Sequence, residues 1–458
     1  MLLISIIFYL VLTVAIGYWA SRRVKTSGDF MLAGRSLPIL LSSSALFATW
    51  FGSETVFGAS SEFLKGGLSS VIEDPFGAAL CLILFGLFFA RKLYSMNLLT
   101  LGDYFKVRYG KRIEIVASAF IVPSYVGYIA AQLVAMGLIL KVVTGTDIWQ
   151  GVVISAVVVT FYTYVGGMWA ISITDFIQSL IIIGGLVVLA IILSEKSGGV
   201  MNVLSTVQPG TFRFLPKADI TEIVIFLSAW SVLGLGSLPS QDVFQRVMSS
   251  DSVQTAVRSC YIAGILYLTV AMLPLFISLC VRHLYPEFVS GDTQLALPSM
   301  VLSHAALPVQ ILFFGSLLSA IMSTTSSAIL APAAIFSENI IRPLAHHRFN
   351  DREFLLITRL SVLGFSILAT IMACWRSNIY ELVGESSILS LVSLFAPLTF
   401  GLYWNRASRV GALLSMISGL ATWFIANRLE LAWPSLVPAL VVSVLTMIFG
   451  SLLWKDKI

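Results

Sequence analysis

A cluster of hydroxyl side chains interrupts an otherwise apolar stretch, residues 317–335. Its members are Ser319, Ser323, Thr324, Thr325, Ser326 and Ser327. If the stretch is a helix, the four serines share one face, because residues four, seven and eight apart lie above one another. Small hard cations prefer such oxygen ligands, so the cluster predicts a cation site. The alternatives are close helix packing, or hydrogen bonds from each hydroxyl to its own helix.

Two acidic residues lie inside other apolar stretches, where an uncompensated charge is costly. Asp175 follows the segment WAISIT and has no Lys or Arg in its own stretch, so its partner must come from elsewhere. Glu54 lies in the middle of residues 37–66 and is interpreted as functional, with a structural hydrogen bond as the alternative. Neutral oxygens with at most one carboxylate favour a monovalent ion such as Na⁺ over a divalent ion.

The remaining polar and sulfur-containing residues predict less specific roles. Glu385 is interpreted as a gate or a structural residue, and Glu73 and Asp74 are expected at a solvated membrane interface. His346 and His347 are expected in a solvated basic loop. The four cysteines lie in apolar stretches without metal-ligand spacing, and we expect them to fill the core; they are Cys81, Cys260, Cys280 and Cys374.

The composition places these residues in a polytopic membrane protein. The chain has 458 residues, of which 58% are hydrophobic and 11% charged, and its mean hydropathy is +0.93. A bilayer core is crossed by about 20 helical residues, and only helices satisfy their own backbone in such apolar segments. We therefore predict an all-α protein of about thirteen transmembrane helices. The predicted spans are 1–20, 37–66, 70–90, 113–142, 146–166, 169–194, 218–245, 256–281, 304–337, 354–374, 379–402, 409–426 and 433–454.

Two predicted spans carry helix-weakening residues at about the same depth. Gly52 and Gly58 lie in the span 37–66, and Gly234, Gly236 and Pro239 lie in the span 218–245. A broken helix exposes backbone carbonyls and partial charges at its ends. Paired breaks in corresponding halves of a chain are the best sequence sign of an inverted-repeat transporter site.

The breaks and the basic residues together predict the organisation of the chain. We expect an extra span and a cytoplasmic linker in 1–36, a first five-helix repeat in 37–194, an extracellular loop in 195–217, an inverted second repeat in 218–403, and two last spans in 404–458. Most of the 28 basic residues fall in segments that are cytoplasmic if the N-terminus is outside and the C-terminus inside. The net charge of +5 thus reflects topology, and we expect no nucleic-acid partner.

Three segments in order resemble motifs of the sodium:solute symporter family. YVGGMWAISITDFIQ (Tyr164–Gln178) resembles its glycine-pair segment leading to an Asp, and LPSQDVFQRVMSSDS (Leu238–Ser252) resembles its Pro–Gln–Arg junction. SAIMSTTSS (Ser319–Ser327) resembles its sodium-binding helix. The resemblance covers nearly the whole chain. It implies a leucine-transporter-type fold with two inverted five-helix repeats whose first helices are broken.

The resemblance also implies ligands for sodium. The main site would take carbonyl oxygens of Ala48, Phe51 and Ala320 with the hydroxyls of Ser323 and Thr324. Some members of the family bind a second sodium ion. Its ligands here would be Asp175, Ser323, Ser326 and Ser327. We leave the choice between one and two sodium ions open.

The solute follows less directly from the resemblance. The choline branch looks most similar around ATWFG (Ala48–Gly52) and GLFFARKLYS (Gly86–Ser95). Its aromatic cage would use Trp50 and Tyr128, which suits cation–π binding of a quaternary ammonium. A cage tryptophan of that branch falls on Ser240, so the cage would be incomplete. The expected solute-binding residues are Trp50, Gly52, Ser53, Glu54, Thr55, Tyr128 and Ser240.

Other branches of the family fit less well at single positions. The acidic residue of the proline branch falls on Trp50, and a glutamine of the sugar branch falls on Thr55. Helix packing is the alternative role for Trp50.

These observations predict sodium-coupled import of a small polar organic solute by alternating access. The solute would be a zwitterion, an amino acid or a quaternary ammonium, such as proline or choline. We expect an integral protein of a bacterial inner membrane and no enzymatic activity, because the sequence carries no catalytic triad. The alternative is a membrane solute sensor of the same fold without net transport. No signalling module is expected after the last span.

Overall fold

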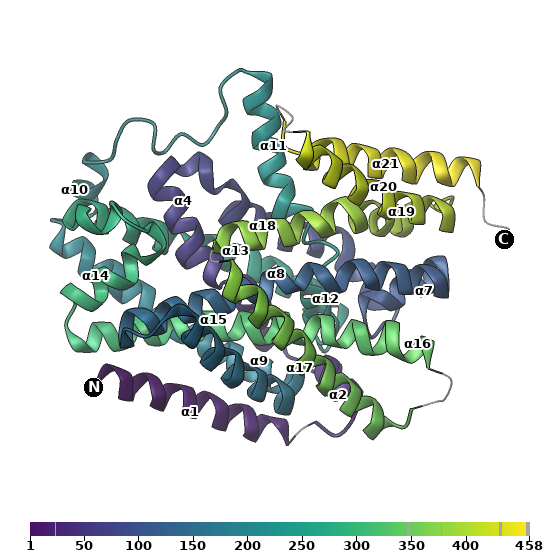
Figure 1. Cartoon of the computed structure of the whole chain (residues 1–458), viewed down its shortest axis with the longest axis horizontal. Helices are drawn as coiled ribbons and strands as arrows, with labels where there is room; N and C mark the ends of the chain where they lie inside the picture. The colour runs from purple at the N-terminus through teal and green to yellow at the C-terminus, as the bar shows by residue number, and fades with distance from the viewer. Residues whose placement is uncertain (23, 346–348, 377, 430–432, 455–458) are drawn as a thin grey trace.

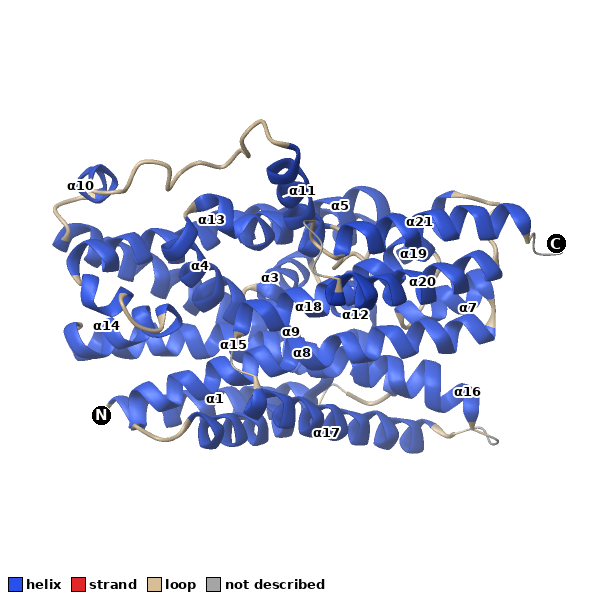
Figure 2. Ribbon diagram, turned by 45° about the horizontal axis from the view of Figure 1, so that its top comes forward, coloured by secondary structure: helices blue, strands red, loops and turns tan. Residues whose placement is uncertain are grey.

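The computed structural model describes residues 1–22, 24–345, 349–376, 378–429 and 433–454. These residues form helices and no β-strand, with one isolated bridge between Leu37 and Ser250 (Figure 2). Figure 1 shows the long helices running in a similar direction, with the two chain ends at opposite ends of the molecule. The predicted all-α membrane fold is confirmed. The expected loop residues His346 and His347 lie outside the described residues.

Nine helices among the described residues are long and apolar enough to cross a membrane. Four further apolar helices are shorter, and each of the thirteen predicted ranges contains helix; the number of crossings stays a prediction. The nine are Leu68–Ser95, Lys111–Thr144, Thr163–Lys196, Val253–Leu284, Leu307–Leu344, Asp351–Trp375, Ile379–Tyr403, Arg409–Arg428 and Leu436–Leu453; the shorter four are Leu2–Thr13, Ile39–Trp50, Ile148–Phe161 and Ile220–Gly234.

Both predicted helix breaks are present. Helix α3 (Ile39–Trp50) ends at Phe51, whose ψ of 77° leaves the helical region, and the chain becomes helical again in a π-helical turn, Glu54–Gly58, followed by α4 (Ala59–Gly66). Helix α11 (Ile220–Gly234) is followed by a turn, and α12 (Gln241–Met248) begins after it. The first break lies at Gly52 and the second near Gly234, Gly236 and Pro239, as the sequence predicts.

The two broken segments contact each other directly. The N–H of Leu37 donates to the carbonyl of Ser249 at 3.0 Å, and the N–H of Asp251 donates to the carbonyl of Leu37 at 3.0 Å. The hydroxyls of Ser42 and Ser250 are also 3.1 Å apart. The start of α3 is thereby held against the end of α12.

A third interruption divides the long helix α9 (Ile148–Lys196). Gly167 has φ 53° and ψ −158°, a conformation that favours glycine. A Cβ there would lie 2.7 Å from the carbonyl oxygen of Phe30. The helix is therefore interrupted at the glycine pair, between the two predicted spans 146–166 and 169–194.

The loop between α9 and α11 contains more structure than the sequence predicts. It includes the short helix α10 (Val200–Ser205) and then crosses one face of the molecule as an irregular segment (Figure 2). The N–H of Leu68 donates to the carbonyl of Thr211 at 2.7 Å, which ties this segment to the start of the neighbouring helix.

Two expectations about exposure are wrong. Asp74 is fully buried, and its carboxylate accepts a hydrogen bond of 2.7 Å from Tyr267. The sequence neighbours of Asp74 suggest the start of a span, but α13 (Val253–Leu284) covers the carboxylate from another part of the chain. Cys374 is exposed near the end of α17 (Asp351–Trp375), so it does not fill the core as the other three cysteines do.

A buried polar cluster joins the short helix α7 (Leu101–Tyr109) to the end of the hydroxyl-bearing helix, where Phe336–Ile341 form a π-helical turn. Asn339 donates to the carboxylates of Asp103 and Glu114, at 2.9 Å each. The hydroxyl of Thr100 donates to the Asn339 side-chain oxygen at 2.6 Å. Gly102 leaves the space that Asn339 fills.

Gly102→Ala is expected to destabilise the fold. An ideal Cβ at Gly102 would lie 2.3 Å from Cγ of Asn339, and overpacking of this kind costs about 1–3 kcal/mol. The expected result is a lower midpoint of thermal unfolding in detergent. Gly364→Ala in α17 is the matched control, because its Cβ would meet no atom within 4 Å. Equal midpoints for the two variants would contradict the packing described for Asn339.

Candidate functional site

The hydroxyl cluster lies on α15 (Leu307–Ile335), whose side chains are buried from Ser316 onward. Ser323 and Thr324 face the broken end of α3. Oγ of Ser323 is 3.3 Å and Oγ1 of Thr324 is 3.0 Å from the carbonyl oxygen of Ala48. Oγ1 of Thr324 is also 3.1 Å from the carbonyl oxygen of Ala320. The contacts bring together four of the five oxygen donors predicted for the main sodium site.

The fifth predicted donor is Phe51, and it lies at the break itself. The N–H of Phe51 still donates to the carbonyl of Phe47 at 3.2 Å, but its own peptide turns out of the helical direction. The next residue, Gly52, is so close to α15 that a Cβ there would lie 2.7 Å from Oγ1 of Thr324. The neutral oxygens of this set suit a monovalent hard cation, so the residues present fit sodium.

Asp175 has the partner that the sequence requires from another segment. It is fully buried in α9, and its Oδ2 is 3.5 Å from Nη2 of Arg246 in α12. Its Oδ1 accepts a hydrogen bond from Ser323. The guanidinium of Arg246 also contacts the hydroxyl of Ser327 and the carbonyl of Ala45, the latter at 3.0 Å.

Arg246 was not among the predicted site residues. A signal was nevertheless present, because Arg246 belongs to the segment Leu238–Ser252 and directly follows the predicted span 218–245, where a buried arginine needs an anion. Its carboxylate partner could be identified only once α9 and α12 were placed together. Buried Arg246 contacts α3, α9 and α15 at once, which makes it the charged centre of this region.

The other hydroxyls of the cluster bond mainly within their own helix. Ser326 and Ser327 both donate to the carbonyl of Ser323, at 2.9 and 2.8 Å, and Thr325 donates to the carbonyl of Ile321 at 2.5 Å. The structural alternative considered from the sequence therefore describes Thr325 and Ser326. Ser327 lies beside the Asp175–Arg246 pair because its hydroxyl contacts Arg246, whereas the hydroxyl of Ser326 bonds within α15.

Polar side chains form hydrogen bonds with backbone groups and with the buried carboxyl group at the first break. Gln132 of α8 (Lys111–Thr144) accepts from the N–H of Ser53 at 3.0 Å and donates to the carboxylate of Glu54 at 2.9 Å. Tyr128 is 3.1 Å from the carbonyl of Thr49 and 3.3 Å from Glu54. The structural hydrogen-bond alternative for Glu54 is therefore present in the fold.

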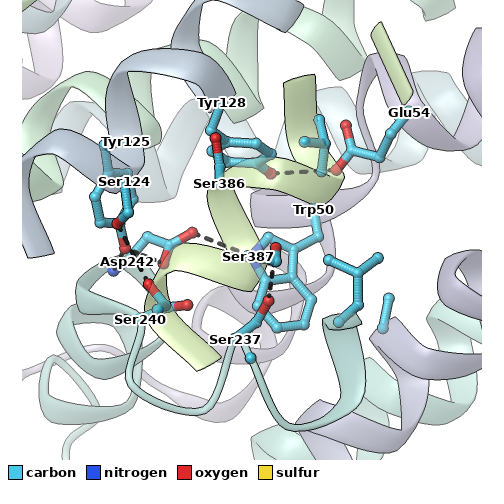
Figure 3. Close-up of a pocket in the computed structure, with 15 residues that line it drawn as sticks. Trp50, Glu54, Ser124, Tyr125, Tyr128, Ser237, Ser240, Asp242, Ser386 and Ser387 are labelled. Carbon is cyan, nitrogen blue, oxygen red and sulfur yellow. Dashed lines mark hydrogen bonds between the residues drawn. The ribbon is translucent and has the colours of Figure 1, made fainter. Parts of the chain in front are cut away.

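A small cavity lies beside this break, between the first and second broken segments (Figure 3). Its volume is about 40 Å³. Trp50 donates through Nε1 to Oδ2 of Asp242 at 3.1 Å, and Tyr125 donates to Oδ1 of the same carboxylate at 2.7 Å. The lining residues are Trp50, Glu54, Ala78, Ser124, Tyr125, Tyr128, Leu233, Gly236, Ser237, Ser240, Asp242, Val383, Ser386, Ser387 and Ser390.

The cavity separates the predicted solute-binding residues into two groups. Trp50, Glu54, Tyr128 and Ser240 line it, whereas Gly52, Ser53 and Thr55 do not. The latter three lie at the break instead: the hydroxyl of Thr55 is 2.6 Å from that of Tyr267, and Gly52 lies against Thr324.

Sequence reasoning missed two prominent residues of the cavity. Asp242 and Tyr125 line it, and Asp242 is the carboxylate that faces its aromatic rings. Glu385 lies away from the cavity, where it forms an ion pair with Arg376; the two side chains are 46% and 37% exposed. The polar motif around Leu238–Ser252 was the available signal for Asp242, because it places an acid directly after a helix break.

Comparison with protein families and relatives points to one class of membrane protein. A model of the sodium:solute symporter family matches residues 30–419. The chain is 29% identical to the high affinity choline transporter 1 of Homo sapiens, over 91% of this chain and 75% of that one. It is 26% identical to the osmoregulated proline transporter of Bacillus subtilis, over 99% of this chain and 95% of the relative.

Solved structures share the fold. A Na⁺-coupled sialic acid symporter, in a substrate-bound outward-open state, has a TM-score of 0.86 and 20% identity, covering 100% of this chain and 99% of that chain. A nucleobase-cation-symport-1 family transporter has a TM-score of 0.59 and 15% identity, covering 94% of this chain and 96% of that chain. At these identities the likeness concerns the fold alone.

Arg246→Gln is expected to destabilise the protein strongly in sodium-free buffer. The change leaves Asp175 buried without its cationic partner, which typically costs about 3–5 kcal/mol. The measurement is thermal unfolding of the purified protein, with sodium omitted so that no bound ion neutralises the carboxylate.

Arg376→Gln provides the matched control. It breaks the partly exposed pair with Glu385, and pairs of this kind contribute about 0–1 kcal/mol. Equal losses of stability in the two variants would contradict the structural role assigned to the buried pair.

Proposed function

Because the chain belongs to the sodium:solute symporter family, we propose that it imports a small quaternary ammonium or zwitterionic solute together with sodium, by alternating access. The observation that carries this proposal is the juxtaposition at the first break. On one side of α3, Ala48 meets the hydroxyls of α15; on the other side, Trp50 meets Asp242 in the cavity. An ion and a solute bound there would contact adjacent residues of the same broken helix.

The main sodium ion is proposed to bind the carbonyl oxygens of Ala48, Phe51 and Ala320 and the hydroxyls of Ser323 and Thr324. The close approach of Ser323 and Thr324 to Ala48 supports this set. Each positive charge that moves inward gains about 2.3 kcal/mol per 100 mV of membrane potential. Sodium binding next to the cavity can therefore drive a solute against its gradient.

A second sodium ion is proposed to bind beside Asp175, with Ser323, Ser326 and Ser327 as further ligands. Asp175 is instead neutralised by Arg246 in the conformation described. A second ion would have to bind after Arg246 moves away from this carboxylate. The number of sodium ions per cycle is thus linked to the position of one side chain.

The cavity chemistry favours a solute that carries a positive charge. Trp50, Tyr125 and Tyr128 offer aromatic rings, and Asp242 offers a buried carboxylate. Aromatic rings attract a quaternary ammonium through its charge. The names of the choline and proline transporters among the relatives support the same two classes. Gly52, Ser53 and Thr55 are proposed to act indirectly, by shaping the break that presents Trp50.

The size of the cavity fits a transport cycle with moving helices. Ligand pockets usually measure about 300–1,000 Å³, whereas this cavity measures about 40 Å³. Entry of an organic solute therefore requires the surrounding helices to separate. We assign 37–194 and 218–403 as the two inverted repeats that move against each other, with 1–36, the loop 195–217 and 404–458 outside them.

The protein is an integral membrane protein, and we propose that it lies in a bacterial inner membrane with the N-terminus outside and the C-terminus in the cytoplasm. The distribution of Lys and Arg supports this orientation. The two chain ends at opposite ends of the molecule also support it (Figure 1). Proline transporters of Bacillus subtilis are among its relatives, which supports the bacterial location.

Uptake into proteoliposomes tests the proposal directly. Radiolabelled choline and proline should accumulate only under an inward sodium gradient, and replacing sodium with potassium should abolish accumulation. Binding of a solute without sodium-driven accumulation would favour the alternative, a membrane solute sensor.

Thr324→Ala is expected to raise the sodium concentration for half-maximal uptake by about tenfold or more, because a bond to a charged group contributes about 1.5–3 kcal/mol. Thr325→Ala is the matched control one residue away, because the Thr325 hydroxyl donates to the carbonyl of Ile321 within α15. Sodium activation that is identical in the two variants would place the ion elsewhere.

Trp50→Ala is expected to raise the half-saturation concentration of choline by about 2- to 30-fold, because a cation–π contact contributes about 0.5–2 kcal/mol. Trp50→Phe keeps a ring but loses the bond to Asp242, and should lie between wild type and Trp50→Ala. The measurement is choline uptake at saturating sodium. An unchanged half-saturation concentration in Trp50→Ala would remove this side chain from the solute site.

A further inference from the structure

A long apolar groove lies on the membrane-facing surface between α9 and α17, which pack against each other. It measures about 540 Å³, within the usual range of about 300–1,000 Å³ for ligand pockets. Val157 of α9 and Ile367 of α17 are 65% and 52% exposed along it. At its floor the hydroxyls of Thr160 and Ser366 bond each other. The groove therefore presents apolar side chains to its occupant.

A cationic side chain lies at one end of this groove. Arg359 precedes Leu360 on α17 and lies one turn before Leu363, both of which line the groove. Its guanidinium carbon is 5.5 Å from the ring centre of Tyr164, another lining residue, and 5.8 Å from that of Phe30. The two rings hold the guanidinium beside the end of the apolar groove.

Arg359 has no anionic partner among the residues that the structure describes. Its Nε is buried and makes no hydrogen bond to any described group. The residue lies eight positions after Asp351, where α17 begins, which corresponds to about 12 Å along the helix. An arginine within such an apolar helix is costly unless it reaches an anion or the interface.

We propose that the groove binds an anionic phospholipid, with one acyl chain between α9 and α17 and the phosphate on Arg359. The occupant must combine a long apolar chain with an anion, and it must be present in the bilayer. A phospholipid has both properties. Arginine recognises phosphate through two parallel N–H donors, and the Nε of Arg359 is one such donor without a partner among the described residues.

Arg352 extends the basic surface toward the end of the helix. It is exposed, and it lies seven residues before Arg359 on the same face of α17. The headgroup of the lipid would lie near it. The site lies on the same side of the molecule as the C-terminus, since α17 begins there (Figure 1). The proposal does not depend on which solute the cavity binds.

Native mass spectrometry of the purified full chain tests the site. The protein is mixed with phosphatidylglycerol or with phosphatidylcholine of the same chain length. Wild type should retain phosphatidylglycerol at least tenfold more than phosphatidylcholine, and excess inorganic phosphate should not displace it. Arg359→Gln should lose this retention at least tenfold, and Arg359→Lys, which keeps the charge but loses the paired donors, should lie between Arg359→Gln and wild type.

Two further variants test the contribution of the groove apart from that of the charge, and the specificity of the Arg359 effect. Ile367→Trp fills the groove without changing charge, and it should also reduce retention at least tenfold. Arg428→Gln removes an exposed arginine at the end of α20 (Arg409–Arg428) and should have no effect. Retention in Arg359→Gln equal to that of wild type, or equal retention of the two lipids, would overturn the proposal. Displacement by inorganic phosphate would mean that the acyl chain contributes nothing.

Discussion

The interrupted helix α3 imposes the constraint on which the rest of the structure depends. Backbone groups freed at a break inside a membrane must find partners within the protein. Here Gln132 accepts the N–H of Ser53, and Thr324 lies within hydrogen-bonding distance of the carbonyl of Ala48. The hydroxyl that stabilises the break is also an oxygen that can bind a cation. The structural requirement and the proposed sodium site therefore coincide.

The buried charges extend this arrangement to the second broken segment. Arg246 projects from α12 and reaches the carbonyl of Ala45 on α3, the carboxylate of Asp175 on α9 and the hydroxyl of Ser327 on α15. Removing either charge would leave the other without compensation. A movement of α12 would change the surroundings of Asp175 and of the hydroxyl cluster together. The cavity residue Asp242 lies one turn earlier on the same short helix.

The sequence allowed much of the fold to be predicted, because apolar length and helix-weakening residues act locally. Both breaks, the glycine break at Gly167 and the buried partner required by Asp175 follow from such local features. The identity of a residue's partner depends on packing between distant segments. For this reason the contacts made by Arg246, Gln132 and Asp242 could not be predicted. The resemblance to the family supplied Ala48 as the partner of Ser323 and Thr324. The predicted exposure of Asp74 was wrong because Tyr267, almost two hundred residues away in the sequence, packs against its carboxylate.

We propose that sodium binds between the broken end of α3 and the hydroxyls of α15. The most direct measurement is a pair of cryo-electron microscopy maps of the purified protein, one in sodium and one in potassium, at a resolution that reveals bound ions. We expect a density feature between the carbonyl oxygen of Ala48 and Oγ1 of Thr324 in the sodium map alone. An empty space there in sodium, with Ala48 and Thr324 in direct contact, would contradict it.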